Sequence, residues 1–133
     1  MIDFSFCYTK NEEKESIKVI ESLKKLGYSF NVNDVDMDKV IIISLTIKSK
    51  LDDILSSYNW LEEQFDYSST HYLKLMPFFI YDSTSDDPEE SFDKYVGEIY
   101  ETIFSGEFKP YCWNLNSKNP EIEFKRVLEQ YSE

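Results

Sequence analysis

Apolar and polar residues alternate along the start of the chain and then change to a helical spacing. Alternation over residues 4–8 is the pattern of a half-buried strand. Thr9 and Glu12 then have the spacing of a capping box, in which a hydroxyl and a carboxylate bond to reciprocal backbone amides. Apolar residues recur at helical spacing over residues 17–26, and Gly27 is placed to end that helix. The pattern therefore predicts a strand followed by a first helix that ends at Gly27.

Two further strands are predicted close together. Residues 28–32 alternate again, and the β-branched run at residues 40–47 is typical of a well-buried strand. Only residues 33–39 separate them. A parallel connection normally needs a dozen or more residues, so this short gap favours an antiparallel hairpin.

A second helix and a fourth strand complete the first part of the chain. Ser49 is a candidate cap for a helix whose apolar positions run from Leu51 to Phe65. Residues 73–81 form a strand pattern, in which Pro77 favours an edge position or a start after the proline. The order β-α-β-β-α-β predicts an α+β protein of ferredoxin-like topology, with two helices on one face of an antiparallel sheet.

The remainder reads as a C-terminal helical extension. A polar linker at residues 82–87 leads into Asp87 and Pro88, a strong helix start, and that helix ends at Gly106. Residues 111–113 are a possible short strand, and a last helix begins at Pro120. We therefore expect one domain over residues 1–133, with a core at 1–81 and acidic helices at 82–133 packed on it.

Charge changes this picture most. The 133 residues carry 26 acidic and 14 basic side chains, a net charge of −12, while 17% of residues are aromatic. Disordered acidic tails lack such aromatic content, so a folded protein with a negative surface is expected. The acidity is concentrated in residues 82–133. A field of this sign repels phosphate backbones and anionic lipids, so we expect no direct nucleic-acid or membrane binding.

Catalytic and metal-binding patterns are sparse. Asp34, Asp36 and Asp38 have the spacing that opens an EF-hand, but the required glycine and final glutamate are absent, which favours an acidic hairpin turn. His71 is the single histidine and stands in no hydrolase, zinc or phosphate-loop motif. Cys7 and Cys112 are far apart and are expected to be buried thiols. We predict no cofactor, no metal and no enzymatic activity.

Location follows from what the chain lacks. No apolar stretch reaches the length of a membrane span. The first residues show no basic flank and no apolar signal region. The sequence therefore predicts a cytoplasmic protein.

Part of the chain resembles a Toll/interleukin-receptor domain. The resemblance rests on the opening strand at residues 4–8, the helix that ends at Gly27, and a helix containing Trp60 and two glutamates after an apolar strand. In that family a glutamate on this helix supports NAD cleavage, and Glu63 is the nearest candidate here. The family has parallel second and third strands joined by a helix, for which the 33–39 gap is too short. The spacing of Glu63 from Trp60 is one residue off.

A second resemblance suits the predicted topology. Residues 3–6, the segment 23–30, the hairpin and the long helix resemble the regulator of RNase E activity B family. Those proteins are small, acidic and ferredoxin-like, and they bind and inhibit a ribonuclease. The closing motif of the family is absent, and its nearest echo is at residues 111–113. The resemblance implies a nuclease inhibitor and assigns no site residue.

These observations favour a non-enzymatic inhibitor of a basic protein, most concretely an immunity protein or antitoxin that neutralises a bacterial nuclease toxin, of the contact-dependent inhibition type. Exposed tyrosine and tryptophan among carboxylates suit a partner rich in lysine and arginine. The expected partner-binding residues are Asp86, Asp87, Glu89, Glu90, Asp93, Glu98 and Glu101, then Asp34, Asp36 and Asp38, with the aromatic anchors Tyr95, Tyr111 and Trp113. The alternatives are an NAD hydrolase of the Toll/interleukin-receptor type, a DNA mimic, and a housekeeping ribonuclease regulator.

Overall fold

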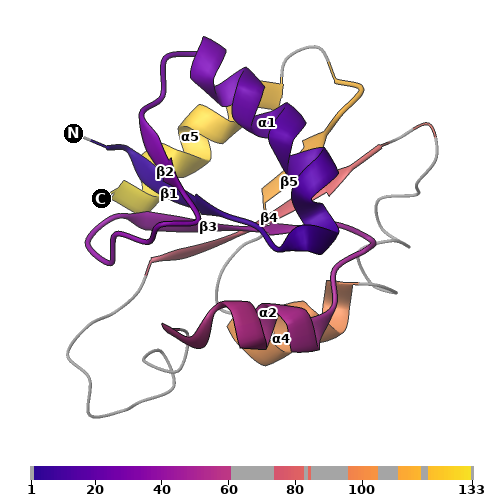
Figure 1. The fold of residues 1–133 in the computed structure, drawn as a ribbon. Helices are drawn as coiled ribbons and strands as arrows, with labels where there is room; N and C mark the ends of the chain where they lie inside the picture. The colour runs from indigo at the N-terminus through magenta and orange to yellow at the C-terminus, as the bar shows by residue number, and fades with distance from the viewer. Residues whose placement is uncertain are drawn as a thin grey trace.

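A computed structural model describes residues 2–60, 74–82, 84, 96–104, 111–117 and 120–132. Five strands alternate with helices along the chain, except that β2 is followed directly by β3 (Figure 1). The strands are β1 (Phe4–Cys7), β2 (Phe30–Val32), β3 (Val40–Leu45), β4 (Leu75–Tyr81) and β5 (Tyr111–Asn114). The helices are η1 (Lys10–Glu12), α1 (Glu13–Lys25), α2 (Leu51–Ser57), α4 (Gly97–Phe104) and α5 (Pro120–Ser132).

The sheet corrects the predicted topology. Its order is β2-β1-β3-β4-β5, and every neighbouring pair is parallel. The predicted antiparallel, ferredoxin-like sheet is therefore wrong, and so is the hairpin between the second and third strands. β2 and β3 instead lie on opposite sides of β1, and the described C-terminal residues supply a fifth strand.

The short connection between β2 and β3 works because β2 is short. Phe4 of β1 is level with both Phe30 and Val40, so the chain returns by about two residues along the strand direction, roughly 7 Å. Residues 33–39, called here the crossover segment, make this return without a helix. They are anchored to β1, since Asn33 N donates to Phe6 O at 2.9 Å and Asp36 N donates to Ser5 Oγ at 3.0 Å.

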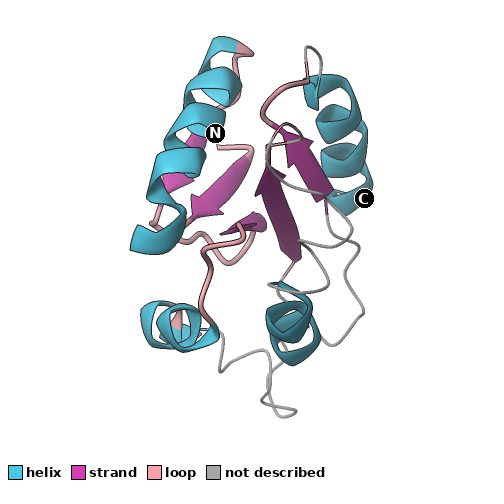
Figure 2. Ribbon diagram, turned by 90° about the vertical axis from the view of Figure 1, so that its right-hand side faces the viewer, coloured by secondary structure: helices cyan, strands magenta, loops and turns pink. Residues whose placement is uncertain are grey.

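Helices cover both faces of the sheet (Figure 2). Alternate residues of each strand point to opposite faces, so β3 places Ile42 against one layer and Ile41 and Ile43 against the other. The first layer contains α1 and α5. The second contains α2 and α4, and the crossover segment adds Val35 and Met37 to it. The result is a sheet buried on both faces, as all-parallel sheets require.

The layer with α1 and α5 is largely aromatic. Phe124 of α5 is fully buried, and its ring lies 5.6 to 6.2 Å from those of Phe78, Tyr111 and Trp113. Tyr111 and Trp113 are only 4% and 3% exposed. Their expected role as exposed anchors for a partner is therefore corrected: both rings belong to the core.

Local signals were read correctly where they concern neighbouring residues. The capping box of Thr9 and Glu12 is present, and Gly27 has the positive φ of 91° that favours glycine. The helix expected from Ser49 to Phe65 begins instead after Lys50, and its backbone leaves helical geometry at Tyr58. Residues 61–65 lie outside the described part of the chain.

Pro77 lies in an interior strand, contrary to the predicted edge position. Lys74 O accepts a hydrogen bond from Ile41 N of β3, and successive residues alternate in direction, so Pro77 faces the β5 side. Pairing with β5 begins only at Phe78. The missing amide of the proline therefore costs the sheet no ladder hydrogen bond.

Candidate functional site

Buried polar side chains gather where β1 and β3 end. In doubly wound sheets of this strand order, ligands bind outside the carboxyl ends of the strands, where the winding direction changes. Here the position between β1 and β3 is filled by Glu12, which is fully buried. Its carboxylate accepts hydrogen bonds from Thr9 N at 2.9 Å and Ser49 Oγ at 3.1 Å, and it also contacts Thr9 Oγ1. A ligand at this edge must therefore lie beside Glu12.

Glu12 has unusual electrostatics for a capping residue. Burial raises the pKa of its carboxyl, and the hydrogen bonds from Thr9 and Ser49 oppose that rise. The neighbouring carboxylate of Asp53 raises the pKa further. Glu12 forms no ion pair in the described part of the chain. It therefore joins the start of the α1 region to the loop between β3 and α2 through hydrogen bonds alone.

A cleft of about 480 Å³ opens beside this position. It lies between the end of β1, the crossover segment and the end of α2, and it is called here the β1 cleft. Its lining includes Tyr8, Asn33, Asp34, Met37, Tyr58 and Trp60. The cleft thus brings together three segments that are distant in the sequence.

Asn33 fixes the wall formed by the crossover segment. Its Oδ1 accepts a hydrogen bond from Tyr8 N at 2.8 Å, and its backbone has φ of 55°. Asparagine is among the few residues that adopt this left-handed conformation readily. With Oδ1 accepting this bond, the NH2 group of Asn33 keeps both of its hydrogen-bond donors. The side chain therefore serves both the backbone turn and the polarity of the cleft.

The opposite wall is aromatic. The rings of Tyr58 and Trp60 have centroids 5.6 Å apart and are tilted by 42°. Tyr58 is 5% exposed, and its buried hydroxyl has no hydrogen-bond partner among the described residues. Burial raises the pKa of this phenol, and the proximity of Cys7 and Glu12 raises it further. Tyr58 is thus neutral at physiological pH.

Cys7 lies at the floor of the same cleft and is not a nucleophile. It is 1% exposed, and burial raises the pKa of its thiol to about 12. The reactive form of cysteine is the thiolate, which this environment disfavours. Cys7 is buried as the sequence predicted, whereas Cys112 of β5 is exposed, contrary to expectation.

The predicted acidic site residues are not brought together. Asp34 lines the β1 cleft, Asp38 is exposed nearby, and Asp36 Oδ1 accepts from Asp38 N, as in a turn. Glu98 and Glu101 are exposed on α4, on the layer that contains α2. The other expected residues lie outside the described part of the chain: Asp86, Asp87, Glu89, Glu90, Asp93 and Tyr95, together with His71, Glu62 and Glu63.

Sequence reasoning missed the contribution of Asn33 and Tyr58. Neither belongs to a recognised motif, and their proximity depends on the parallel crossover that the sequence analysis did not predict. The only signal was Trp60, which the resemblance to Toll/interleukin-receptor domains had already singled out. Within the described ranges, no group of three histidine, cysteine or acidic side chains is arranged to hold a metal ion.

Comparisons with known proteins bring no relative. No protein-family model, no curated protein and no solved structure matches this chain. In the described residues, no helix has both the length and the apolar character needed to cross a membrane. Function must therefore be argued from the site.

Proposed function

We propose that this chain is a Toll/interleukin-receptor-like domain that binds an NAD-type dinucleotide in the β1 cleft and cleaves it with the help of Glu63. The observation that carries the proposal is the position of Trp60, which lines a cleft at the carboxyl end of β1 in an all-parallel sheet. Glu63 follows Trp60 by three residues in the sequence. The family likeness is an analogy, and the chemistry of the cleft has to support it independently.

The fold meets only part of one departure from that family noted in the sequence, because the strand direction agrees and the crossover helix is absent. β2 and β3 are parallel, although the crossover segment joins them without a helix. The spacing of Trp60 and Glu63 remains one residue shorter than usual. The resemblance to the ferredoxin-like ribonuclease regulators loses its basis, because the sheet is not antiparallel.

The charge of the cleft suits the nicotinamide end of the dinucleotide. The oxidised nicotinamide ring is planar and cationic, and aromatic faces attract such cations. Among the described lining residues the only formal charge is that of Asp34, and it is negative. A carboxylate beside the departing ring also stabilises the positive charge that develops on the ribose as the glycosidic bond breaks. We assign this last role to Glu63.

The phosphates of the dinucleotide need a different environment. A second cavity, of about 630 Å³, lies at the start of α2, and its lining holds Lys10 and Lys50 together with the carboxylates of Asp52, Asp53 and Glu98. Lys10 follows Tyr8 of the β1 cleft by two residues. The two cavities lie at opposite ends of α2, and a dinucleotide that spans them would place its phosphates beside Lys10 and Lys50 but also beside three carboxylates.

The test is NAD consumption by the purified full chain. We expect slow but measurable release of nicotinamide, lost in Glu63→Ala and retained in Glu62→Ala. Glu62 carries the same charge and is next to Glu63 in the sequence, so it is a matched control for charge and composition. Equal loss in both variants, or no consumption by the unmodified chain, would overturn the proposal.

A second candidate function is supported by the charge distribution. Asp34, Asp38, Glu98 and Glu101 are exposed, and no ion pair to them occurs among the described residues. Such carboxylates suit electrostatic capture of a basic protein, and steering of this kind raises association rates by about one to three powers of ten. The candidate is thus the acidic inhibitor expected from the sequence, in the form of an immunity protein or antitoxin against a nuclease.

A binding measurement separates this candidate from the first. The tagged protein would capture a basic nuclease at low salt, and association would slow as salt rises. Glu101→Lys, on α4 and outside both cavities, would slow association without affecting NAD consumption. Association that is insensitive to both salt and this charge reversal would contradict capture through α4.

A further inference from the structure

Among its described lining residues, the β1 cleft carries one formal charge, the carboxylate of Asp34. Asp34 is exposed and forms no ion pair in the described part of the chain. Cys7, at the floor, stays a neutral thiol because burial raises its pKa to about 12. The cleft therefore attracts a cation.

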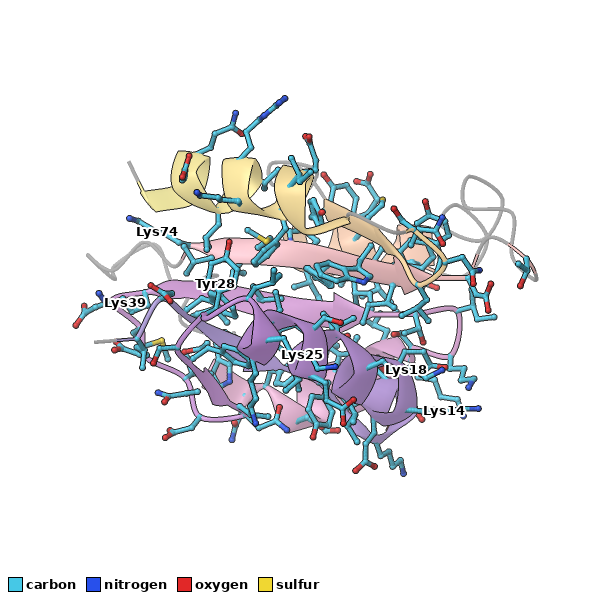
Figure 3. The ribbon with its side chains drawn as sticks, turned by 90° about the horizontal axis from the view of Figure 1, so that it is seen from above. Lys14, Lys18, Lys25, Tyr28, Lys39 and Lys74 are labelled. Atoms are coloured by element: carbon cyan, nitrogen blue, oxygen red, sulfur yellow. The ribbon has the colours of Figure 1, made fainter. Side chains whose placement is uncertain are left out.

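The lysines of this protein lie elsewhere. Lys14 and Lys18 belong to α1, in the layer opposite to that of α2, and Lys39 and Lys74 lie toward the other side of the molecule (Figure 3). The lysines of the cavity at the start of α2 are at the far end of that helix from the cleft. No lysine lines the β1 cleft in the part of the chain that the structure describes. A cation from another molecule can therefore reach Asp34 without displacing one from this chain.

The apolar wall of the cleft offers an aromatic ring to such a cation. Trp60 is half-buried, whereas Tyr58, whose ring centroid is 5.6 Å from that of Trp60, is 5% exposed. Trp60 is therefore the ring of this pair that a ligand can contact. Val35 and Met37 of the crossover segment add half-buried apolar surface to the lining. Tryptophan is the aromatic side chain that attracts cations most strongly.

A carboxylate and a tryptophan in one cleft suit a guanidinium better than other cations. The guanidinium is planar and weakly hydrated, so it can stack on an aromatic ring while two of its N–H groups donate to one carboxylate. An ammonium group is a compact, strongly hydrated point charge and has no plane to stack. The ring nitrogen of a pyridinium carries no hydrogen that could be donated to Asp34.

The charge of the whole chain selects the source of the guanidinium. The net charge is −12, and Asp38, Glu98 and Glu101 are exposed without an ion pair among the described residues. This field favours the approach of a basic protein, whereas free arginine also carries an α-carboxylate that the field repels. We propose that the β1 cleft receives an arginine side chain of a basic partner protein, with its guanidinium stacked on Trp60 and paired with Asp34. The proposal rests on the second candidate function, the capture of a basic protein, and the arginine would take the place assigned above to the nicotinamide ring.

The first experiment measures binding of N-acetyl-arginine amide to the full chain by the amide chemical shifts of Asn33 and Asp34. N-acetyl-citrulline amide is the neutral isostere of this probe, and N-acetyl-lysine amide controls for attraction by net charge alone. We expect the arginine probe to bind with a dissociation constant below about 10 mM, and at least about fivefold more tightly than either control. Weaker binding, equal binding of the arginine and lysine probes, or tighter binding of the pyridinium probe 1-methylnicotinamide would overturn the proposal.

Variants assign the binding to the cleft. Asp34→Asn should remove the preference for arginine over citrulline, whereas Asp38→Asn, on the same segment but outside the lining, should retain it. Both positions are exposed, so neither substitution disturbs the core. Trp60→Leu should weaken binding of the arginine probe by about threefold or more. Equal effects of the two aspartate variants would overturn the proposal.

Glu101→Lys separates this inference from the candidate function on which it rests. The position is outside the cleft, so the substitution should slow capture of a basic nuclease and leave probe binding unchanged. Failure of the arginine probe, with salt-dependent capture intact, would overturn the arginine pocket alone. Probe binding without capture of any basic nuclease would support the pocket and contradict the nuclease as its partner.

Discussion

The two faces of the sheet are built differently. The face covered by α1 and α5 is a continuous aromatic core in which the rings of Phe4, Phe78 and Phe124 meet edge to face. The face covered by α2 and α4 is mainly aliphatic, with the crossover segment where a helix could otherwise lie, and it borders the β1 cleft. The aromatic face is packed continuously by its rings. The face covered by α2 and α4 borders a cleft and so leaves room for a ligand.

The largest effect is expected on the aromatic face. Phe124→Ala removes a fully buried ring that contacts five other aromatic rings. We expect the free energy of unfolding to fall by about 3–5 kcal/mol, as measured by urea unfolding. Ile122→Ala is the matched control, since Ile122 is on the same helix but 66% exposed. A similar loss in both variants would show that the helix, and not the aromatic contact, stabilises this face.

A smaller effect is expected where the crossover segment meets β1. Asn33→Ala removes the hydrogen bond to Tyr8 N and places alanine at a φ of 55°. We expect the free energy of unfolding to fall by about 1–3 kcal/mol. Asn33→Gly also removes the hydrogen bond but tolerates the backbone conformation. A clear difference between the two variants measures the backbone strain, and equal loss would assign the whole effect to the hydrogen bond.

The sequence predicted features that depend on residues close together in the chain better than features that depend on distant residues. The capping box of Thr9 and Glu12 involves residues three apart and was predicted fully. The strands were found as apolar runs, but their pairing was wrong, because the rule for crossover length assumes strands longer than β2. Periodicity also could not show whether the rings of Tyr111 and Trp113 face solvent, since their burial depends on α5.

The candidate site was predictable only in part. Trp60 and Asp34 were singled out from the sequence, one by a family resemblance and one by its acidic neighbours. Asn33 and Tyr58 carry no local signal, because only the fold brings them to one cleft with Cys7 and Tyr8, which are distant in the sequence. The β1 cleft is therefore a consequence of the parallel crossover, and a wrong sheet topology conceals it.

Glu12 makes the stability of the fold depend on pH. Its pKa is raised above the ordinary glutamate value of 4.5 by burial, so the folded state holds the proton more tightly than the unfolded state. The stability that this proton contributes is present below pH 4.5 and is lost as pH rises through the folded pKa. We expect Glu12→Gln to gain stability relative to the unmodified chain over that rise, measured by urea unfolding at several pH values. Glu13→Gln, at the neighbouring exposed position, should show no such trend. A trend of the opposite sign would mean that the hydrogen bonds to the carboxylate outweigh its burial.

The smallest expected effect is that of removing the Tyr58 hydroxyl, which tests whether the ring or the polar atom of this residue stabilises the fold. The hydroxyl of Tyr58 is buried, and the described part of the chain offers it no partner, so its desolvation is uncompensated there. Tyr58→Phe keeps the ring that contacts Trp60 and removes that oxygen. We therefore expect the free energy of unfolding to stay the same or to rise by up to about 1 kcal/mol, measured by thermal and urea unfolding. A fall of that size in the free energy of unfolding would show that the Tyr58 hydroxyl forms a hydrogen bond in solution. The face covered by α2 and α4 would then contain no unpaired hydroxyl at this position. An unchanged or raised stability would mean that the native fold retains an unpaired polar atom beside its cleft, at a position where phenylalanine would serve packing equally well.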